Sequence, residues 1–261
     1  MSTKCFRRVR LGLLIGVAVV AAATPRAAAD LVVMTSGGYY AALEHLSPEF
    51  EQAAGHHVRI VEGPSMGTSA EAIPNRLARG ERADLLIMVK ASLDALVATG
   101  QVRADGRVDL AASKIGMAVR AGQPTPDVGT VEALTRVLLN AKSIAYSDSA
   151  SGTYIQNELY KRLGIEAQVL PKSRMVVAER IGNVVARGDA EIGFQQVSEL
   201  LPIAGIVFAG PIPDAVQKIT VFSAGIPANA PQADAARQLI RYLTSDTARP
   251  VVERTGLQPV R

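Results

Sequence analysis

The chain has 261 residues, of which 48% are hydrophobic and 20% charged, so it can bury a core as one large or two small domains and is not intrinsically disordered. The 28 Lys and Arg residues outnumber the 24 Asp and Glu residues, but five basic residues precede the first acidic one, Asp30, and without those five the count is 23 against 24. The positive excess is therefore confined to the N-terminus and gives no support to nucleic-acid binding.

The N-terminal segment has the pattern of a secretory signal peptide. A basic start precedes the apolar run Leu11–Ala23, which is too short to span a membrane. Ala27-Ala28-Ala29 then offers a cleavage site before Asp30, although earlier cleavage and a short membrane anchor stay open as alternatives. We expect an exported, soluble mature protein in the periplasm. Cleavage also removes the only cysteine, Cys5, which excludes disulfides and thiolate chemistry from the mature chain.

After the signal segment, strand-like and helix-like patterns alternate. In the first half, strands are expected at 31–34, 58–61 and 85–89, with helices at 41–50 and 70–77 between them, the second interrupted or kinked at Pro74 and its continuation capped by Gly80. The strand segments are short and largely apolar. Such runs, separated by helices, are typical of a parallel sheet that is covered by helices on both faces.

The alternation continues in the second half and indicates a second lobe. Strands are expected at 115–119, 143–146, 190–194 and 219–224, and helices at 130–139, 153–163, 181–186, 197–201, 233–243 and 251–252. We therefore expect a signal peptide at 1–29, a first lobe made of 30–113 plus 218–261, and a second lobe at 114–217. The strands that begin at 115 and 219 are candidates for the two crossings between the lobes.

Three strand-to-helix turns are rich in small residues that offer hydrogen-bond donors. They are Thr35–Gly38, Ser65–Ser69 and Asp148–Thr153. Each places free backbone N–H groups and hydroxyls at a helix start, where the helix dipole favours an anion, and glycine lets a ligand approach the backbone closely. Ordinary helix capping explains one such turn. Three of them at the carboxyl ends of strands, split across two lobes, predict an anion-binding cleft.

The order and spacing of these turns resemble the type 2 periplasmic solute-binding proteins, especially their molybdate-binding branch, from Leu31 to Pro259. The segments Arg79–Ile87 and Arg187–Phe194 carry the resemblance together with the first turn. It implies a two-lobed α/β fold, each lobe a mostly parallel sheet flanked by helices, with the ligand cleft between the lobes. One implied function is that of a periplasmic substrate-binding protein, which delivers molybdate or another small oxyanion or carboxylate to an ABC permease.

Departures from the molybdate-binding pattern favour a larger polar ligand. The serine loop is longer, at Gly67–Arg76, and the tyrosine that is common in the last ligand loop is replaced around Gln195-Gln196. The segments Met66–Ser69, Tyr146–Gly152 and Gly193–Gln196 are similar to an enzymatic branch of the same fold, the aconitate isomerases. That resemblance implies interconversion of trans-aconitate and cis-aconitate by allylic proton transfer, without a metal or any other cofactor.

This reaction needs clamps for carboxylates, a base, and fixed donors for a developing oxyanion. Arg174 is our preferred bidentate clamp and Arg180 is the reserve. The expected substrate-binding residues are Ser36, Gly37, Gly38, Ser65, Gly67, Thr68, Ser69, Ser149, Ser151, Gly152, Thr153, Arg174, Gln195 and Gln196. The base is left open among four candidates, each of which also has a structural explanation: Tyr39, Asp148, Glu71 and Glu179.

Other features narrow the function further. His56 and His57 lie where a helix ends and a strand starts, and adjacent strand residues point to opposite faces, so we expect solvated turn histidines and no metal site. The absence of tryptophan argues against a sugar-binding protein that stacks aromatic rings on its ligand. We expect a monomer that binds a small anion such as aconitate. The isomerase and the solute carrier share one cleft and differ in whether it holds a base.

Overall fold

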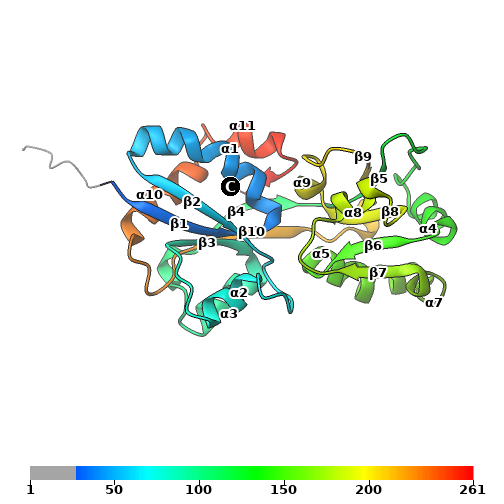
Figure 1. Cartoon of the computed structure of the whole chain (residues 1–261), viewed down its shortest axis with the longest axis horizontal. Helices are drawn as coiled ribbons and strands as arrows, with labels where there is room; N and C mark the ends of the chain where they lie inside the picture. The colour runs from blue at the N-terminus through cyan, green and yellow to red at the C-terminus, as the bar shows by residue number, and fades with distance from the viewer. Residues whose placement is uncertain (1–27, 261) are drawn as a thin grey trace, which may run out of the picture.

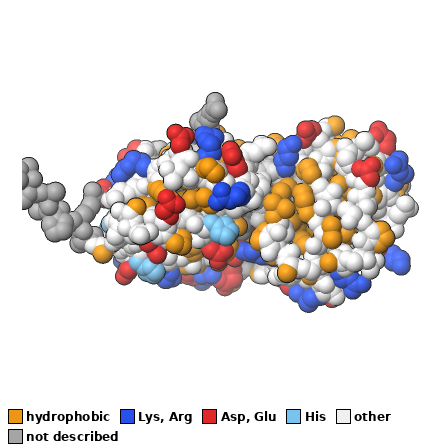
Figure 2. Space-filling model, turned by 90° about the horizontal axis from the view of Figure 1, so that it is seen from above, with side chains coloured by type: hydrophobic (Ala, Val, Ile, Leu, Met, Phe, Trp, Pro, Cys, Tyr) orange, Lys and Arg blue, Asp and Glu red, His pale blue; other side chains and the backbone are white. Residues whose placement is uncertain are grey.

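The computed structural model describes residues 28–260 and shows two α/β lobes, each built on its own sheet (Figure 1). Residues 1–27, which hold the basic start and the apolar run of the expected signal peptide, lie outside the described residues, whereas Ala29 of that segment is described and packs in the core of the first lobe. Within the described part of the chain, no helix is long and apolar enough to cross a membrane. Basic and acidic side chains are interspersed over the face in Figure 2, without a basic stripe.

The first lobe is a six-stranded sheet of order β11-β4-β10-β3-β1-β2. Its strands are β1 (Asp30–Thr35), β2 (His57–Glu62), β3 (Leu85–Val89), β4 (Val108–Ser113), β10 (Thr220–Gly225) and β11 (Gln258–Pro259). β1 lies between β2 and β3 and is parallel to both. β10 is antiparallel to β3 and β4, and β11 is antiparallel to β4.

Helices cover both faces of this sheet, which explains why β3 is apolar along its whole length. The helices are α1 (Gly37–Ala54), α2 (Ile73–Ala78), α3 (Lys90–Ala98), the short 3-10 turn η1 (Ala104–Gly106), α10 (Ala233–Leu243) and α11 (Arg249–Arg254). Leu85 and Ile87 pack in one cluster with residues of α1 and α10, whereas Leu86 and Met88 pack in another with residues of α3. Figure 1 shows α1 and α11 above the sheet and α2 and α3 below it.

The second lobe is a five-stranded sheet of order β7-β6-β8-β5-β9. Its strands are β5 (Ile115–Arg120), β6 (Ile144–Ser147), β7 (Ser173–Val176), β8 (Ile192–Gln196) and β9 (Ile206–Pro211). Its helical segments are α4 (Val131–Asn140), α5 (Ala150–Tyr154), the π-helical turn η2 (Ile155–Leu159), α6 (Tyr160–Arg162), α7 (Glu166–Val169), η3 (Leu170–Lys172), α8 (Ile181–Arg187), α9 (Val197–Leu200) and η4 (Asp214–Val216). The core again has two sides, because Tyr146 packs with α5 and Ala145 packs with α8.

The two-lobed α/β fold is confirmed, but the sheets are mixed and not mostly parallel. The parallel pairs are β1–β2, β1–β3, β6–β7 and β6–β8, and the remaining pairs are antiparallel. The reason lies in the connections between the lobes. The chain leaves the first sheet through β4 and comes back through β10, so these neighbours run in opposite directions.

The two crossings are short and tied together. The first is at Lys114, between β4 and β5, and the second follows η4. The Gln217 side chain accepts a hydrogen bond from the Ile115 N–H at 2.9 Å and donates to the carbonyls of Ile115 and Ile212, both at 3.0 Å. Lys114 also pairs with Asp214 at 2.7 Å. Lobe boundaries at 113/114 and 217/218 therefore remain our proposal for the domain division.

Candidate ligand site

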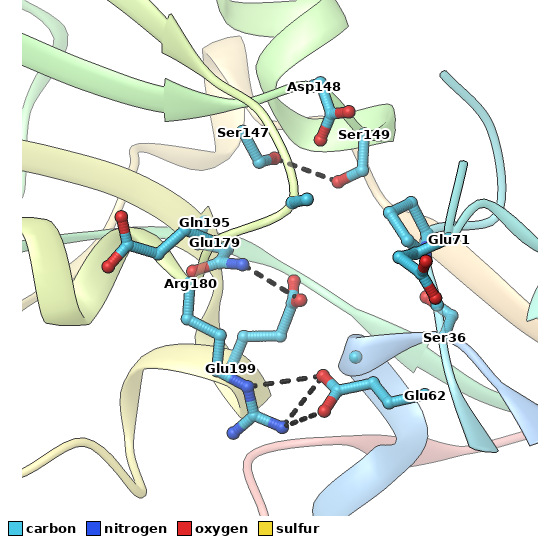
Figure 3. Close-up of a pocket in the computed structure, with 14 residues that line it drawn as sticks. Ser36, Glu62, Glu71, Ser147, Asp148, Ser149, Glu179, Arg180, Gln195 and Glu199 are labelled. Carbon is cyan, nitrogen blue, oxygen red and sulfur yellow. Dashed lines mark hydrogen bonds and ion pairs between the residues drawn. The ribbon is translucent and has the colours of Figure 1, made fainter. Parts of the chain in front are cut away.

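A cavity of about 230 Å³ lies between the two lobes, beyond the carboxyl ends of β1, β2, β6 and β8 (Figure 3). Strand ends of this kind are where open α/β sheets bind ligands. The first lobe contributes Ser36, Gly37, Glu62, Gly63, Pro64 and Glu71 to the lining. The second lobe contributes Ser147, Asp148, Ser149, Ala178, Glu179, Arg180, Gln195 and Glu199.

The first donor turn opens into this cavity. The Ser36 side chain makes no capping bond to the first N–H groups of the 18-residue helix α1, and the Tyr39 N–H bonds to the Ser36 carbonyl at 3.0 Å. A Cβ on Gly37 would lie 2.4 Å from the Glu199 Oε1 atom, so a larger residue at position 37 would displace that carboxyl group. Gly38 has a different role, because a Cβ there would lie 2.1 Å from the Phe222 ring in the core.

The second donor turn does not line the cavity. The Ser65 hydroxyl accepts a hydrogen bond from the Val89 N–H at 2.8 Å, and the Ser69 hydroxyl accepts one from the Glu71 N–H at 3.1 Å. Gly67 has φ +107°, and a Cβ there would lie 3.0 Å from the Asp148 carbonyl oxygen in the other lobe. The turn Ser65–Ser69, including the exposed Thr68, therefore closes over the cleft beside the cavity.

Only the start of the third donor turn lies at the cavity. Ser149 lines it, and the Ser147 hydroxyl shares hydrogen bonds with those of Ser149 and Ser151 at 2.9 and 3.2 Å. Gly152 is packed against the strand end, where a Cβ would lie 1.7 Å from the Ser147 carbonyl oxygen. Ser151, Gly152 and Thr153 are thus interior residues of α5 that do not line the cavity.

The arginine in the cavity is Arg180, not Arg174. Its guanidinium contacts both carboxylate oxygens of Glu62, at 2.8 and 2.9 Å, and this pair joins the two lobes. The same guanidinium lies over the Tyr40 ring, 5.0 Å from its centroid. Arg174 is exposed on β7 and does not line the cavity. The reserve clamp of the sequence analysis therefore has the better position.

Three of the four base candidates are placed poorly for proton transfer. Glu71 pairs with Arg76, and Glu179 pairs with Arg187 at 2.5 Å. The hydrogen bond from Arg187 holds the pKa of the Glu179 carboxyl below its usual range. Tyr39 is fully buried in the core of the first lobe and lines no part of the cavity, and burial raises the pKa of its phenol.

Asp148 and Glu199 are the two cavity acids without an ion pair among the described residues. Asp148 is almost fully buried and its Oδ2 atom has no hydrogen-bond partner; burial raises the pKa of its carboxyl. Glu199 is also almost fully buried, and burial raises the pKa of its carboxyl to about 7. The Gln195 amide donates a hydrogen bond to Glu199 Oε1 at 3.0 Å.

Sequence reasoning missed Glu62, Ser147 and Glu199. Glu62 ends a strand and Glu199 lies in the first helical turn after one, the positions where α/β sheets present side chains to ligands. That rule could have found both. Ala178 was also missed: it lines the cavity with φ 57°, which is uncommon for a residue other than glycine. Gln195 lines the cavity as expected, whereas Gln196 donates to the Thr220 hydroxyl instead.

The histidines lie away from the cavity. His56 is buried and its Nδ1 accepts a hydrogen bond from the Ala29 N–H at 3.1 Å, which corrects the expectation that it is solvated. His57 is 2.9 Å from a Glu51 carboxylate oxygen. Within residues 28–260, no group of three or more His, Cys, Asp or Glu side chains could hold a metal ion.

A family model of bacterial extracellular solute-binding proteins matches residues 31–258. The chain belongs to this family. Its members are, by that description, extracellular proteins that bind solutes. Among curated relatives, an aconitate isomerase of Pseudomonas sp is 46% identical over 247 residues, which cover 93% of this chain and 94% of that protein.

Solved structures of other binding proteins have the same two-lobed fold. The periplasmic molybdate-binding protein of Azotobacter vinelandii has a TM-score of 0.71 at 20% identity, covering 88% of this chain and 100% of that chain. A sulfate-binding protein of Mycobacterium tuberculosis has a TM-score of 0.67 at 16% identity, covering 89% of this chain and 87% of that chain. At these identities the likeness shows the fold and not the ligand.

Proposed function

We propose that the protein is an exported isomerase that interconverts trans-aconitate and cis-aconitate in the cleft between its lobes. The observation that carries the proposal is the 46% identity with an aconitate isomerase over 93% of the chain. The cleft supports it, because Asp148 and Glu199 are buried acids with raised pKa values, and such groups are typical of proton-transfer sites. A solute carrier needs complementary donors but neither an acid nor a base.

The reaction moves one proton and one C=C bond. A base removes a proton from the methylene carbon beside one carboxylate, and the C–H electron pair spreads over a dienolate. A proton then bonds to the far carbon of the allylic unit, and the double bond takes its new place. The electron pair of the broken C–H bond stays within the substrate, so the reaction requires no redox cofactor.

The cavity has to accept an anion although five carboxyl groups line it. Glu62, Glu71 and Glu179 each pair with an arginine, which offsets their charge. Burial favours the neutral form of Asp148 and Glu199. A neutral carboxyl donates a hydrogen bond, so Asp148, which lines the cavity, is our candidate donor to a substrate carboxylate.

Arg180 is our candidate clamp for a second substrate carboxylate. Its fork already holds the Glu62 carboxylate through two oxygens, the geometry that favours carboxylate recognition. The substrate then binds by exchange, with its carboxylate taking the place of Glu62. The free N–H groups at the start of α1, at Gly37 and Gly38, are candidates for stabilising the developing oxyanion.

The test is direct turnover. Purified protein lacking residues 1–29 is incubated with trans-aconitate, and cis-aconitate is followed by chromatography. We expect the same final ratio of isomers from either starting isomer, and we expect activity to survive dialysis against EDTA. Heat-inactivated protein is the control. If neither isomer is converted by folded protein, the isomerase proposal is wrong.

The second candidate function is that of the substrate-binding protein of an ABC importer, and the fold shared with the molybdate-binding protein favours it. The size of the cavity favours a larger ligand. A cavity needs only about 10–15 Å³ to hold one water, so a cavity of about 230 Å³ has room for a ligand larger than one compact oxyanion. Tight calorimetric binding of molybdate without aconitate turnover would select this second function.

We propose a periplasmic location for the mature protein, with residues 1–29 removed as a signal peptide. The extracellular character of the family supports the location, and the basic and apolar order of the N-terminal sequence supports the cleavage. We propose that the mature protein acts as a monomer, because residues of a single chain line both sides of the cleft.

A further inference from the structure

We propose that Glu199 is the residue that removes the proton from the substrate's methylene carbon. The assignment rests on the isomerase activity proposed above. Glu199 lies in the first turn of α9, directly after β8, and its side chain lines the cavity between the lobes (Figure 3). Only 8% of the residue is exposed, so its contact with a ligand is made in a space from which bulk water is largely excluded.

The Glu199 carboxyl group is held by a hydrogen bond within its own lobe, and its helix is fixed against the other lobe. The Gln195 amide donates to its Oε1 atom at 3.0 Å, and the Oε1 atom occupies the space that a side chain at position 37 would fill. The neighbouring Ser198 hydroxyl donates to the Gly38 carbonyl at 2.7 Å, which fixes α9 against the start of α1. A base held this way keeps its position relative to the substrate without a mobile side chain.

The charges around Glu199 leave it available as a base. Glu62 faces it from the end of β2, and Arg180 faces it from the segment before α8. Burial raises its pKa most, the Arg180 charge opposes that effect, and the Glu62 charge adds to it. The resulting pKa of about 7 is close to a neutral working pH, where a base is both ionised and able to accept a proton.

Asp148 is the competing acid, and its surroundings suit it to a different task. Its Oδ2 atom lies beside Gly67, where a Cβ would be 3.1 Å away, and has no partner in the described chain. We therefore assign Asp148 to holding the substrate and not to accepting the methylene proton. In the step itself, the Glu199 carboxylate forms an O–H bond as the C–H bond breaks, and the electron pair passes into the dienolate. The same carboxyl group then delivers the proton to the far carbon and becomes ionised again.

Four variants test the assignment: Glu199→Gln, Glu199→Asp, Asp148→Asn and, as a matched control, Glu253→Gln on the exposed surface of α11. For each, kcat is measured by chromatography, the Kd of trans-aconitate by calorimetry, and folding by thermal melting. We expect Glu199→Gln to lower kcat by about 100- to 10,000-fold, the usual contribution of general acid–base catalysis, while Kd changes less than about tenfold. Glu253→Gln should match the wild type.

Glu199→Asp separates a proton-transfer role from a structural one. It keeps a carboxyl group, so it should retain a measurable rate, with the acidic limb of its kcat/KM profile displaced from that of the wild type. An unmoved acidic limb, a Glu199→Gln kcat within about fivefold of the wild type, or loss of turnover in Asp148→Asn alone with intact binding would each overturn the assignment. An inactive wild type would instead overturn the isomerase function.

Discussion

The burial of Glu199 has a consequence for folding as well as for the cleft. Its carboxyl pKa is raised from 4.5 to about 7, so the folded state holds the proton more tightly than the unfolded state does. The Glu199 contribution to stability is therefore most favourable below about pH 4.5 and declines as pH rises through 7, because ionising the buried group costs free energy.

We predict that Glu199→Gln gains stability relative to the wild type as pH rises from 4.5 to 8. The gain is at most about 3 kcal/mol, since one pKa unit corresponds to about 1.4 kcal/mol. Urea unfolding of both proteins at the two pH values measures it. A difference between variant and wild type that is the same at both pH values would show that Glu199 titrates normally in the folded protein.

Single residues were the hardest part of the site to predict from sequence. Glu62 and Arg180 are far apart in the chain, and only the packing of the lobes brings them together. Glycines gave a misleading pattern: Gly37 does border the cavity, whereas Gly38 and Gly152 are glycines because Phe222 and a backbone carbonyl leave no room. Close approach to a ligand and close packing in a core require the same residue type.

At the level of helices and strands, hydrophobic patterning predicted the elements that are buried on both faces. β3 is such an element, and apolar periodicity also predicted α10, which buries one face and spans Ala233–Leu243 as expected. The strands β4, β7, β9 and β11 were missed. β7 and β9 are sheet edges with half-buried or exposed residues, so neither a uniform apolar run nor clean alternation marks them.

Arg180, the candidate clamp for a substrate carboxylate, lies in the segment that joins β7 to α8. Arg180→Ala should weaken trans-aconitate binding by about 10- to 150-fold, because a charge-assisted bidentate contact is worth about 1.5–3 kcal/mol. Arg180→Lys should recover only part of the affinity, since an ammonium group lacks the planar fork. Calorimetry on both variants and on Arg174→Ala decides between the two arginines. A large loss of affinity in Arg174→Ala alone would assign the carboxylate clamp to Arg174 on the exposed strand β7.

At the scale of the whole molecule, the two lobes already touch across the cleft. Arg180 and Glu62 pair between them, Ser198 bonds to Gly38, and Gly67 lies against Asp148. A ligand that bridges both lobes makes its contacts only with the folded state. Binding should therefore appear as increased thermal stability of the entire chain.

We predict that trans-aconitate at about 100 times its Kd raises the melting temperature by about 5–10 °C. Such saturation adds about 2.7 kcal/mol, and each kcal/mol shifts the midpoint by about 2–4 °C for a chain of this size. Molybdate at the same concentration serves as the comparison. A shift with molybdate and none with either isomer of aconitate would favour the solute carrier over the isomerase.

The Gln217 amide forms hydrogen bonds both to Ile115, where the chain enters the second lobe, and to Ile212, where it returns. The two crossings are therefore held together as one hinge. A single hinge would let the lobes rotate about one axis, with the largest displacement in the parts of the lobes farthest from the hinge. Opening at this point would separate Glu62 from Arg180 and Gly67 from Asp148 together. Substrate entry and the hydration of the buried acids would then be one event, so the proton would meet bulk solvent only when the substrate is free to leave.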